Sequence, residues 1–249
     1  AGGYFAPIIR EYIRRSNAPS DVGIKVAVKD RLHGARNPLS HLNLPNISHQ
    51  EVEDSMMLWD PIRFLEACPS SDGACAMIIA NKDLVSKSPK PPAWILGGAM
   101  RSEPTIYAGR DEVNPRAGRD CAKDVYAQAG ISDPRRQFDC AEIYVPFSWY
   151  EPMWLENLGF ADQGEGWRLT LDGATSLDEG GDIPWNCSGG VLSSNPIGAS
   201  GMIRFAEAAR QVRGDADQHQ VENARLALGH AYGGGAQFFS MWVVGANKP

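Results

Sequence analysis

The sequence predicts an α/β fold in which a sheet is covered by helices on both faces. Strand-like apolar segments alternate with helical segments through most of the chain after residue 92, and such alternation is typical of layered α/β proteins. Of the 249 residues, 43% are hydrophobic and 22% are charged, which is the composition of a globular protein. A chain of this length can form one large unit or two modest domains.

The first part of the chain contains two helical segments followed by irregular structure. Residues 4–15 carry apolar positions at helical spacing, and residues 21–33 give a second helical stretch. Residues 36–46 are rich in Asn, Pro and Leu and predict a loop. A short helix then begins at Ser48, because Ser48 and Glu51 have the spacing of a capping box.

A proline-rich stretch marks the predicted boundary between two domains. Before it, residues 60–68 are amphipathic, and the apolar run 74–80 is short enough to be a buried strand. Residues 87–92, Lys-Ser-Pro-Lys-Pro-Pro, cannot continue a helix or a central strand, because proline lacks an amide proton and fixes its own backbone angle. We therefore place one domain at residues 1–90 and the other at residues 91–249.

Beyond this boundary the predicted elements alternate regularly. They are, in order, strand 93–97, helix 117–129, strand 140–147, helix 150–158, a polar glycine-rich stretch 161–182, helix 199–212, and strands 224–231 and 238–244.

Composition excludes several classes of protein. The net charge of −6 argues against a general nucleic-acid or membrane surface, because both need a basic face. No apolar run approaches the roughly 20 residues of a membrane-spanning helix, and the start has no signal-peptide order, so we expect a cytoplasmic protein. The chain starts without methionine, which is consistent with a truncated or partner-completed polypeptide.

The cysteines predict neither disulfides nor a metal site. Their number is odd and no Cys-x-x-Cys occurs, so we expect reduced thiols and no zinc ribbon. The five cysteines are Cys68, Cys75, Cys121, Cys140 and Cys187.

Three segments carry residue types suited to chemistry. In residues 186–201 two glycine-bearing turns lead into a helix, so that backbone amides and a helix N-terminus can face a ligand oxygen. Residues 230–236 place three glycines between two apolar strands, and residues 139–148 run from a strand into a helix. For each glycine turn, the alternative is a packing role without a ligand.

In this order and spacing, the three segments resemble the C-terminal half of the thiolase superfamily. That family carries an Asn-x-x-Gly-Gly…Gly-His-Pro-x-Gly-Ala-(Ser/Thr)-Gly loop, a Cys-x-Gly-Gly-Gly turn, and a strand that ends in His or Asn. Residues 28–38, 60–74 and 154–160 are similar to sterol-carrier-protein type thiolases and to lipid-transfer-protein aldolases of steroid side-chain breakdown.

The resemblance therefore covers nearly the whole chain, and it implies a fold. Expected are layers in the order α-β-α-β-α, mixed five-stranded sheets and two pseudo-twofold halves. Residues 1–90 would then be the tail of the N-terminal half, and residues 91–249 the C-terminal half.

The chain departs from the family pattern at three positions. Tyr144 stands where the strand-end His or Asn is expected, Asn195 where the Gly-His-Pro histidine is expected, and Ala231 where the second cysteine is expected. The nucleophilic cysteine belongs to the family's N-terminal half and has no counterpart here. Thiolysis needs a thiolate and a base, so these replacements remove the groups on which it depends.

The replacements favour retro-aldol cleavage of a bulky β-hydroxyacyl-CoA. Asn195 can donate amide hydrogen bonds to a thioester oxygen that becomes an enolate, and one such donor is worth about 3 to 4 kcal/mol. Tyr144 can transfer a proton if its neighbours lower a phenol pKa that is ordinarily about 10. The resemblance implies a second tyrosine in the site, and Tyr232, next to His230, is our candidate for it.

The site prediction is thus made up of two sets. The predicted catalytic residues are Tyr144, Tyr232, Asn195 and His230. The predicted substrate-binding residues are Asn186, Ser188, Gly189, Gly190, Gly198, Gly233 and Gly234, and the amides of Gly189, Gly190 and Gly234 would hold the enolate oxygen.

Each chemical interpretation has a structural alternative. Tyr144 and Tyr232 are equally typical of core aromatics, His230 is more typical of a satisfied structural histidine, and Cys140 and Cys187 are typical of small buried residues. Three basic residues are expected to be charged groups in solvated loops, and the alternative is that they bind CoA phosphates. They are Arg31, His33 and Arg36.

Two other functions stay open from the sequence. One is an acyltransferase, a thiolase whose nucleophilic cysteine lies on a missing segment or partner chain. The other is a non-catalytic thiolase-fold subunit. The acyl group is not identified, because the apolar segments 149–154 and 167–171 that would line its pocket cannot be oriented from sequence.

The resemblance also implies partners and a cofactor requirement. We expect a homodimer, a small acyl-CoA-binding partner with a zinc ribbon and an OB-fold, and, as an alternative source of the missing part, a chain that carries the N-terminal thiolase half. We expect no cofactor in this chain apart from the CoA of the substrate, no metal, and no nucleic-acid or membrane partner.

Overall fold

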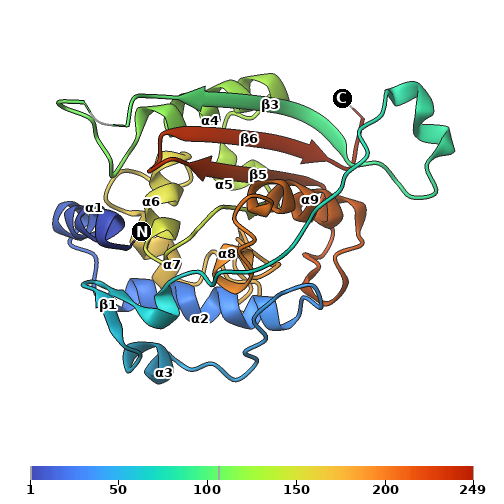
Figure 1. Ribbon diagram of the computed structural model, residues 1–249. Coiled ribbons are helices and arrows are strands. Elements are labelled where there is room, and N and C mark those ends of the chain that lie inside the picture. The colour runs from blue at the N-terminus through green and yellow to red at the C-terminus, as the bar shows by residue number, and fades with distance from the viewer. Residues whose placement is uncertain (1, 106, 249) are drawn as a thin grey trace.

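A four-stranded mixed sheet forms the centre of the fold (Figure 1). The computed structural model describes residues 2–105 and 107–248, and the strand order of the sheet is β3-β6-β5-β4. β4 runs parallel to β5, whereas β6 is antiparallel to both β5 and β3. The predicted α/β class is confirmed. The strands are β3 Trp94–Ser102, β4 Cys140–Glu142, β5 Leu226–Gly233 and β6 Phe238–Gly245.

Helices cover both faces of this sheet, as predicted. α4 (Arg116–Ala129) packs against β3 and β6, and α9 (Ser200–Arg213) packs mainly against β5. The side chains of β6 alternate between these helices: Phe239 and Val243 belong to the core that contains α4, whereas Trp242 packs with α9. This alternation is the period of two that a strand covered on both faces requires.

Of the residues that precede the sheet, α2 (Asp21–Ala35) and α3 (His49–Glu53) lie in the lower part of Figure 1, and α1 (Gly2–Ser16) lies above them at the left. α1 and α2 confirm the two predicted helices. α2 packs against α7 (Gly166–Leu171) and α8 (Gly190–Ser193), two helices that come after β4 in the sequence. The two predicted domains therefore contact each other closely, and their division at residue 90 stays a prediction.

The remaining helices are short. α3 begins after Ser48, where the predicted capping box with Glu51 is confirmed. Residues 60–68 contain strand β2 and a single 3-10 turn. The remaining elements are α3 His49–Glu53, β1 Met57–Trp59, β2 Ile62–Arg63, η1 Phe64–Glu66, η2 Lys82–Lys87, α5 Pro134–Gln137, α6 Tyr150–Asn157 and η3 Asp217–His219.

The apolar run 74–80 is not the buried strand that the sequence predicted. It is extended chain that crosses in front of α9 (Figure 1), and none of its backbone groups forms a hydrogen bond with another described residue. Ile78 is 98% exposed and Ile79 is 71% exposed. Apolar residues form a buried strand only where a neighbouring strand pairs with them, and this segment has no such neighbour in the described chain.

The number of strands also differs from the prediction. The resemblance implies five-stranded sheets, whereas the described residues form one four-stranded sheet and the two-stranded β1-β2 pair. The unpaired run 74–80 accounts for one strand that was predicted and is not formed.

The strand that leads into the site is shorter than predicted. β4 ends at Glu142, whereas the sequence predicted a strand to residue 147. The next two amides, of Ile143 and Tyr144, donate to side chains instead of a neighbouring strand. Their acceptors are Asn186 Oδ1 at 2.8 Å and His230 Nδ1 at 3.3 Å. The strand pairing therefore ends where the predicted site begins.

Candidate active site

The candidate site lies where the parallel strands β4 and β5 end. Tyr144 follows β4 by two residues, and Tyr232 is next to the last residue of β5. The start of α9 approaches the same edge, since a Cβ atom placed on Gly201 would lie 2.8 Å from the Cβ of Ala231. Ligand sites in α/β sheets are commonly found at the carboxyl ends of parallel strands, where the following loops converge.

Tyr144 and Asn195 share one hydrogen-bonded site. The Tyr144 hydroxyl donates to Asn195 Oδ1 at 3.2 Å, and the Ser200 hydroxyl donates to the same oxygen at 2.7 Å. Tyr144 is 8% exposed and Asn195 is 5% exposed, so the pair lies just below the surface. The predicted mechanism requires these two side chains to be adjacent, and the fold brings them together.

Burial keeps the phenol of Tyr144 protonated. Removal from water raises its pKa to about 12, and negative charge on Cys68 would act in the same direction. The hydrogen bonds with Asn195 and Ser200 lower the pKa by less. The sequence-based role depended on neighbours that lower this pKa, and that expectation is wrong. At neutral pH Tyr144 is therefore a proton donor in its resting state.

Tyr232 forms an aromatic wall beside Tyr144. Its ring centroid lies 5.3 Å from that of Tyr144 in an edge-to-face arrangement and 5.7 Å from that of Tyr150 in a stacked one. Trp154 lies edge-on to Tyr232 at 5.1 Å. Tyr232 is half-buried, and burial among these rings raises its pKa well above the usual range.

The two predicted wall segments are placed differently. Residues 149–154 overlap α6, which supplies Tyr150 and Trp154 to the aromatic wall. Residues 167–171 lie in α7, which packs against α6 and α2. The second segment thus supports the first and is not shown to line the site.

His230 lies beneath the site and is not placed to exchange protons with a substrate. Its side chain is fully buried, and its Nδ1 accepts the backbone amide proton of Tyr144, so the ring proton is on Nε2. Within the described residues Nε2 has no hydrogen-bond partner. Burial lowers the pKa of His230 to about 3. The predicted catalytic role does not fit this position, in which His230 holds the backbone of Tyr144.

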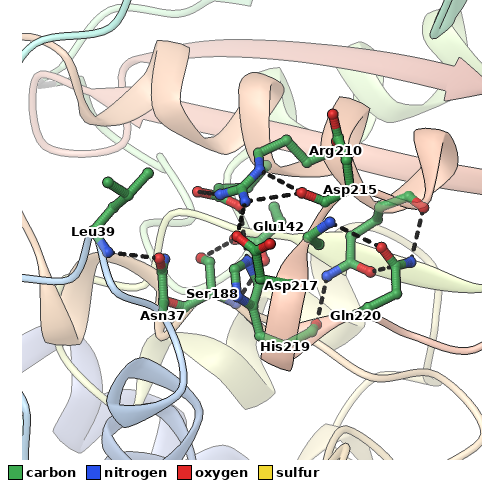
Figure 2. Close-up of polar contacts among 12 residues, drawn as sticks. Asn37, Leu39, Glu142, Ser188, Arg210, Asp215, Asp217, His219 and Gln220 are labelled. Carbon is green, nitrogen blue, oxygen red and sulfur yellow. Dashed lines mark hydrogen bonds and ion pairs between the residues drawn. The ribbon is translucent and has the colours of Figure 1, made fainter. Parts of the chain in front are cut away.

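Asn186 and Ser188 build the loop instead of facing a ligand. Asn186 Nδ2 donates to Asp30 Oδ2 at 3.2 Å, while its Oδ1 accepts from the backbone that follows β4. Figure 2 shows Ser188 beside Glu142: the serine hydroxyl donates to Glu142 Oε2 at 2.7 Å, and its amide donates to Oε1 at 3.0 Å. Asn37 donates to the Ser188 carbonyl at 3.1 Å. The predicted substrate-binding role does not fit these two residues, because both are buried and hydrogen-bonded within the fold.

A buried ion pair holds this loop against the start of the site. Arg204 and Glu142 are 2% and 1% exposed, form an ion pair, and both contact Ser188. Burial raises the pKa of Glu142, and Arg204 opposes that shift. This buried ion pair, together with the Ser188 hydroxyl, links α9 to β4.

The amides of Gly189 and Gly190 are also occupied. The Gly189 amide donates to the Asn186 carbonyl at 2.8 Å, and the Gly190 amide donates to Ser188 Oγ at 3.3 Å. The prediction that they hold an enolate oxygen therefore does not fit the structure. Gly189 has φ +90°, and a Cβ atom there would lie 2.4 Å from the Cα of Gly34.

The other three predicted glycines lie in the segment between Asn195 and α9 and where β5 turns into β6. Gly198 belongs to the Asn195 loop, and Gly233 and Gly234 form the start of the turn between β5 and β6. A Cβ atom on Gly198 or Gly233 would have no atom within 4 Å, so neither position is required for close packing. A role for these three glycines in binding substrate stays a prediction.

Residues 68–71 contribute two site residues that the sequence did not identify. Asn195 Nδ2 donates to Cys68 Sγ at 3.2 Å, and the backbone amide of Asn195 donates to Ser71 Oγ at 3.0 Å. Cys140 and Cys187 were interpreted as small buried residues, and both are buried, whereas Cys68 and Cys75 are half-buried. The available signal was the position of Cys68 inside one of the segments that resemble the aldolases.

Two of the three basic residues assigned to solvent are buried. Arg31 is 2% exposed and donates to backbone carbonyls of residues 65–67 and to that of Leu192. His33 is fully buried, and burial lowers its pKa to about 3. Both are out of reach of a CoA phosphate. The side chain of Arg36 is 39% exposed and pairs with Asp178, which lies far away in the sequence between α7 and α8.

Features that could mark a second site in the described residues are metal-binding groups, membrane-spanning helices and surface clefts. The described residues contain no group of three or more His, Cys, Asp and Glu side chains that could hold a metal ion. Among the described helices, none has the length and apolar character needed to cross a membrane. Three surface clefts lie over β3 and α4 or beside α1, and none of them is lined by a predicted site residue.

Comparison with known proteins identifies the family. Residues 98–246 match the family described as thiolase C-terminal domain-like, so the chain belongs to the thiolase superfamily. It is 33% identical over 218 residues to a steroid side-chain-cleaving aldolase of Thermomonospora curvata, covering 85% of this chain and 54% of that enzyme. It is 30% identical over 232 residues to an acetyl-CoA acetyltransferase of Methanothermobacter thermautotrophicus, covering 92% of this chain and 59% of the relative.

A solved structure is similar over almost the whole chain. The Ltp2-ChsH2(DUF35) aldolase superposes with a TM-score of 0.85 at 28% identity, covering 99% of this chain and 63% of that one. The resemblance inferred from the sequence and the thiolase fold that it implies are thus confirmed. The chain spans between 54% and 63% of the length of these three relatives.

Proposed function

We propose that this chain is the catalytic part of a carbon-carbon lyase that cleaves a β-hydroxyacyl-CoA by a retro-aldol reaction. The observation that carries the proposal is the Tyr144–Asn195 hydrogen bond beside Tyr232, at a position where thiolases carry imidazole and thiol groups. The similarity to two aldolases supports it.

The reaction needs one proton transfer and one stabilised negative charge. The bond between Cα and Cβ breaks, the hydroxyl on Cβ becomes a carbonyl and releases its proton, and Cα of the thioester enolate takes up a proton. Asn195 Nδ2 donates to the enolate oxygen. A neutral phenol can accept the hydroxyl proton while it passes its own proton on, so Tyr144 and Tyr232 can move a proton to Cα without a resting phenolate.

The substrate class follows from this chemistry and from the relatives. CoA enters as part of the substrate, and we propose no resident cofactor. The name of the Thermomonospora curvata relative suggests a steroid as the bulky group beyond Cβ. We propose a cytoplasmic location on the basis of the sequence alone.

A partner is part of the proposal. The similar aldolase structure contains Ltp2 together with ChsH2(DUF35), so a small zinc-ribbon and OB-fold subunit that binds acyl-CoA is our candidate partner. The exposed run 74–80 supports a further contact with a chain or segment that carries the N-terminal thiolase half, since an apolar extended segment can add to a sheet edge. A homodimer is our expectation for the assembled enzyme.

The test uses the protein together with any subunit that co-purifies with it. A panel of β-hydroxyacyl-CoA and β-ketoacyl-CoA esters is incubated with and without free CoA, and products are separated by chromatography. Cleavage of β-hydroxyacyl esters without free CoA is the expected result. Cleavage only of β-ketoacyl esters, and only with free CoA, would show that the proposal is wrong.

The similarity to an acetyl-CoA acetyltransferase favours one alternative, a thiolase with its nucleophilic cysteine outside these residues. That mechanism forms an acyl-enzyme, so mass spectrometry of the intact protein after incubation with acyl-CoA would show a covalent adduct. Saturable binding of acyl-CoA without turnover would instead indicate a non-catalytic subunit.

A further inference from the structure

We propose that Cys68 is a positioning residue for the candidate active site, because its sulfur sets the direction in which the side-chain amide of Asn195 faces. This inference rests on the proposed function, in which that amide binds the enolate oxygen. It adds a residue from a segment far from Asn195 in the sequence.

The Asn195 amide has a defined set of contacts. Its Oδ1 accepts from the hydroxyls of Tyr144 and Ser200 at 3.2 Å and 2.7 Å, which uses both oxygen lone pairs. One Nδ2 proton is donated to Cys68 Sγ at 3.2 Å. The second Nδ2 proton has no partner among the described contacts, so it is the donor that remains for a substrate oxygen.

The two hydroxyls alone do not determine this direction. A hydroxyl both donates and accepts, so Tyr144 and Ser200 could equally accept from Nδ2 if the amide were turned by half a rotation. In that orientation both amide protons would be used by the hydroxyls and none would face a substrate. The oxygen would then face Cys68.

A thiol at position 68 disfavours the turned orientation. A thiol is a weak donor, so the amide oxygen would exchange two hydroxyl donors for one poor S–H donor. Burial also raises the pKa of the Cys68 thiol, which keeps it neutral near pH 7. Sulfur therefore favours the orientation that leaves one amide proton free.

Neighbouring contacts hold Cys68 and Asn195 in place. The Ser71 hydroxyl accepts from the backbone amide of Asn195 at 3.0 Å, and the backbone amide of Ser71 donates to the backbone carbonyl of Asn195 at 3.3 Å. Arg31 donates to the Ala67 carbonyl at 3.0 Å and to the Leu192 carbonyl at 2.9 Å, which ties together the two loops. A donor held in this way needs no rearrangement when charge develops on the substrate.

The central experiment compares Cys68→Ala with Cys75→Ala by NMR. Cys75 is also half-buried and lies in the same stretch of chain, but it has no described hydrogen bond with Asn195. The side-chain amide signals of Asn195 are assigned through their loss in Asn195→Asp. We expect both signals to shift in Cys68→Ala and to stay unchanged in Cys75→Ala. Unchanged Asn195 signals in Cys68→Ala would overturn the proposal.

Kinetics give a second, independent result. Cys68→Ala is expected to lower kcat by about 10-fold with little change in KM, because a misdirected donor is lost mainly in the transition state. Cys68→Ser is expected to lie between wild type and Cys68→Ala, since a hydroxyl accepts the amide proton but also stabilises the turned orientation. Equal activity of Cys68→Ala and wild type contradicts the positioning role.

The outcomes separate this proposal from the proposed function. If wild type cleaves no acyl-CoA ester, the function is wrong, while the NMR comparison still reports the orientation of Asn195. If Cys68→Ala does not fold, Cys68→Ser gives the same NMR comparison. An alkylation test completes the set: Asn195→Ala should increase the rate at which iodoacetamide modifies Cys68, and an unchanged rate counts against the contact.

Discussion

Tyr144 illustrates how burial decides the chemistry of a single side chain. The sequence identified a tyrosine at the end of a strand, and its role as a base depended on a lowered pKa. In the structure burial raises that pKa to about 12, so the resting phenol carries its proton. In the proposed reaction Tyr144 would therefore relay a proton and not remove one by itself.

Tyr144→Phe tests this relay directly. We expect kcat for β-hydroxyacyl-CoA cleavage to fall by about 100-fold or more, which is typical for loss of a positioned proton-transfer group. Stability should fall by only about 1 kcal/mol, because one hydrogen bond is lost and Ser200 still donates to Asn195. Tyr107→Phe, at a tyrosine that is 44% exposed, is the control and should retain full activity. Full activity of Tyr144→Phe would contradict the mechanism.

His230 makes a prediction about stability and pH. Its pKa is about 3 in the folded protein and about 6.5 when unfolded. Between these values the unfolded chain binds the proton and the folded protein does not. The unfolding free energy therefore keeps its full value above pH 6.5 and decreases as the pH falls toward 3. At pH 5 the loss amounts to about 2 kcal/mol.

Urea unfolding between pH 5 and pH 7 measures this effect. His230→Asn should reduce the loss of unfolding free energy on acidification by about 2 kcal/mol relative to wild type. His49→Asn is the control, since the side chain of His49, at the start of α3, is 49% exposed. Parallel pH profiles for wild type and His230→Asn would show that His230 is not held neutral by burial.

The contact between α2 and α8 shows what glycine contributes to an element. Gly34 near the end of α2 and Gly189 before α8 approach so closely that a Cβ atom on Gly189 would meet the Gly34 Cα at 2.4 Å. The sequence assigned the glycines of this loop to a ligand. The structure assigns Gly189 to helix packing, which in turn positions the Asn195 loop.

Gly189→Ala should therefore be strongly destabilising. We expect a loss of about 3 kcal/mol or more, from the positive φ of +90° together with the backbone clash. Gly130→Ala is the matched control, because Gly130 has φ +70° at the end of α4 with no atom within 4 Å of a Cβ atom. That control should lose only about 1 kcal/mol. Urea unfolding of both variants gives the comparison, and equal losses would exclude the packing role.

For the molecule as a whole, the unpaired run 74–80 is the main departure from a closed α/β fold. Ile78 and Ile79 are exposed and Met77 packs against the core, although the run follows directly on the loop that holds Asn195. The relatives are longer than this chain, which covers 54% to 63% of their lengths. A partner for this run would therefore lie next to the candidate site.

Ile78→Lys tests whether this exposed surface promotes self-association while contributing nothing to the core. Since Ile78 is 98% exposed, the unfolding free energy should change by no more than about 0.5 kcal/mol. Light scattering should show less self-association of the 249-residue chain at high concentration, because the exposed apolar surface is smaller. Leu39→Lys, at a leucine that is 73% exposed outside this run, should have a smaller effect. A loss of several kcal/mol in Ile78→Lys would indicate that the segment is buried in solution.

Local patterns in the sequence determined the family and most of the secondary structure, with the run 74–80 and the end of β4 as exceptions. Helical spacing located α1 and α4, and glycine, proline and capping residues located most element ends to within a few residues. The resemblance selected Tyr144, Asn195 and Tyr232, which the fold does bring together. These features follow from neighbouring residues or from motifs, so the chain order is sufficient to find them.

Only the tertiary structure decided which of the selected polar groups stay free. Asn186 and Ser188 form hydrogen bonds inside the fold, and His230 accepts one with Nδ1. Arg31 is buried although the sequence assigned it to solvent. Cys68 reaches Asn195 across 127 positions of sequence, and no local pattern reports such a contact. Burial and hydrogen-bond pairing depend on what packs against a side chain, and that is determined only when distant segments meet.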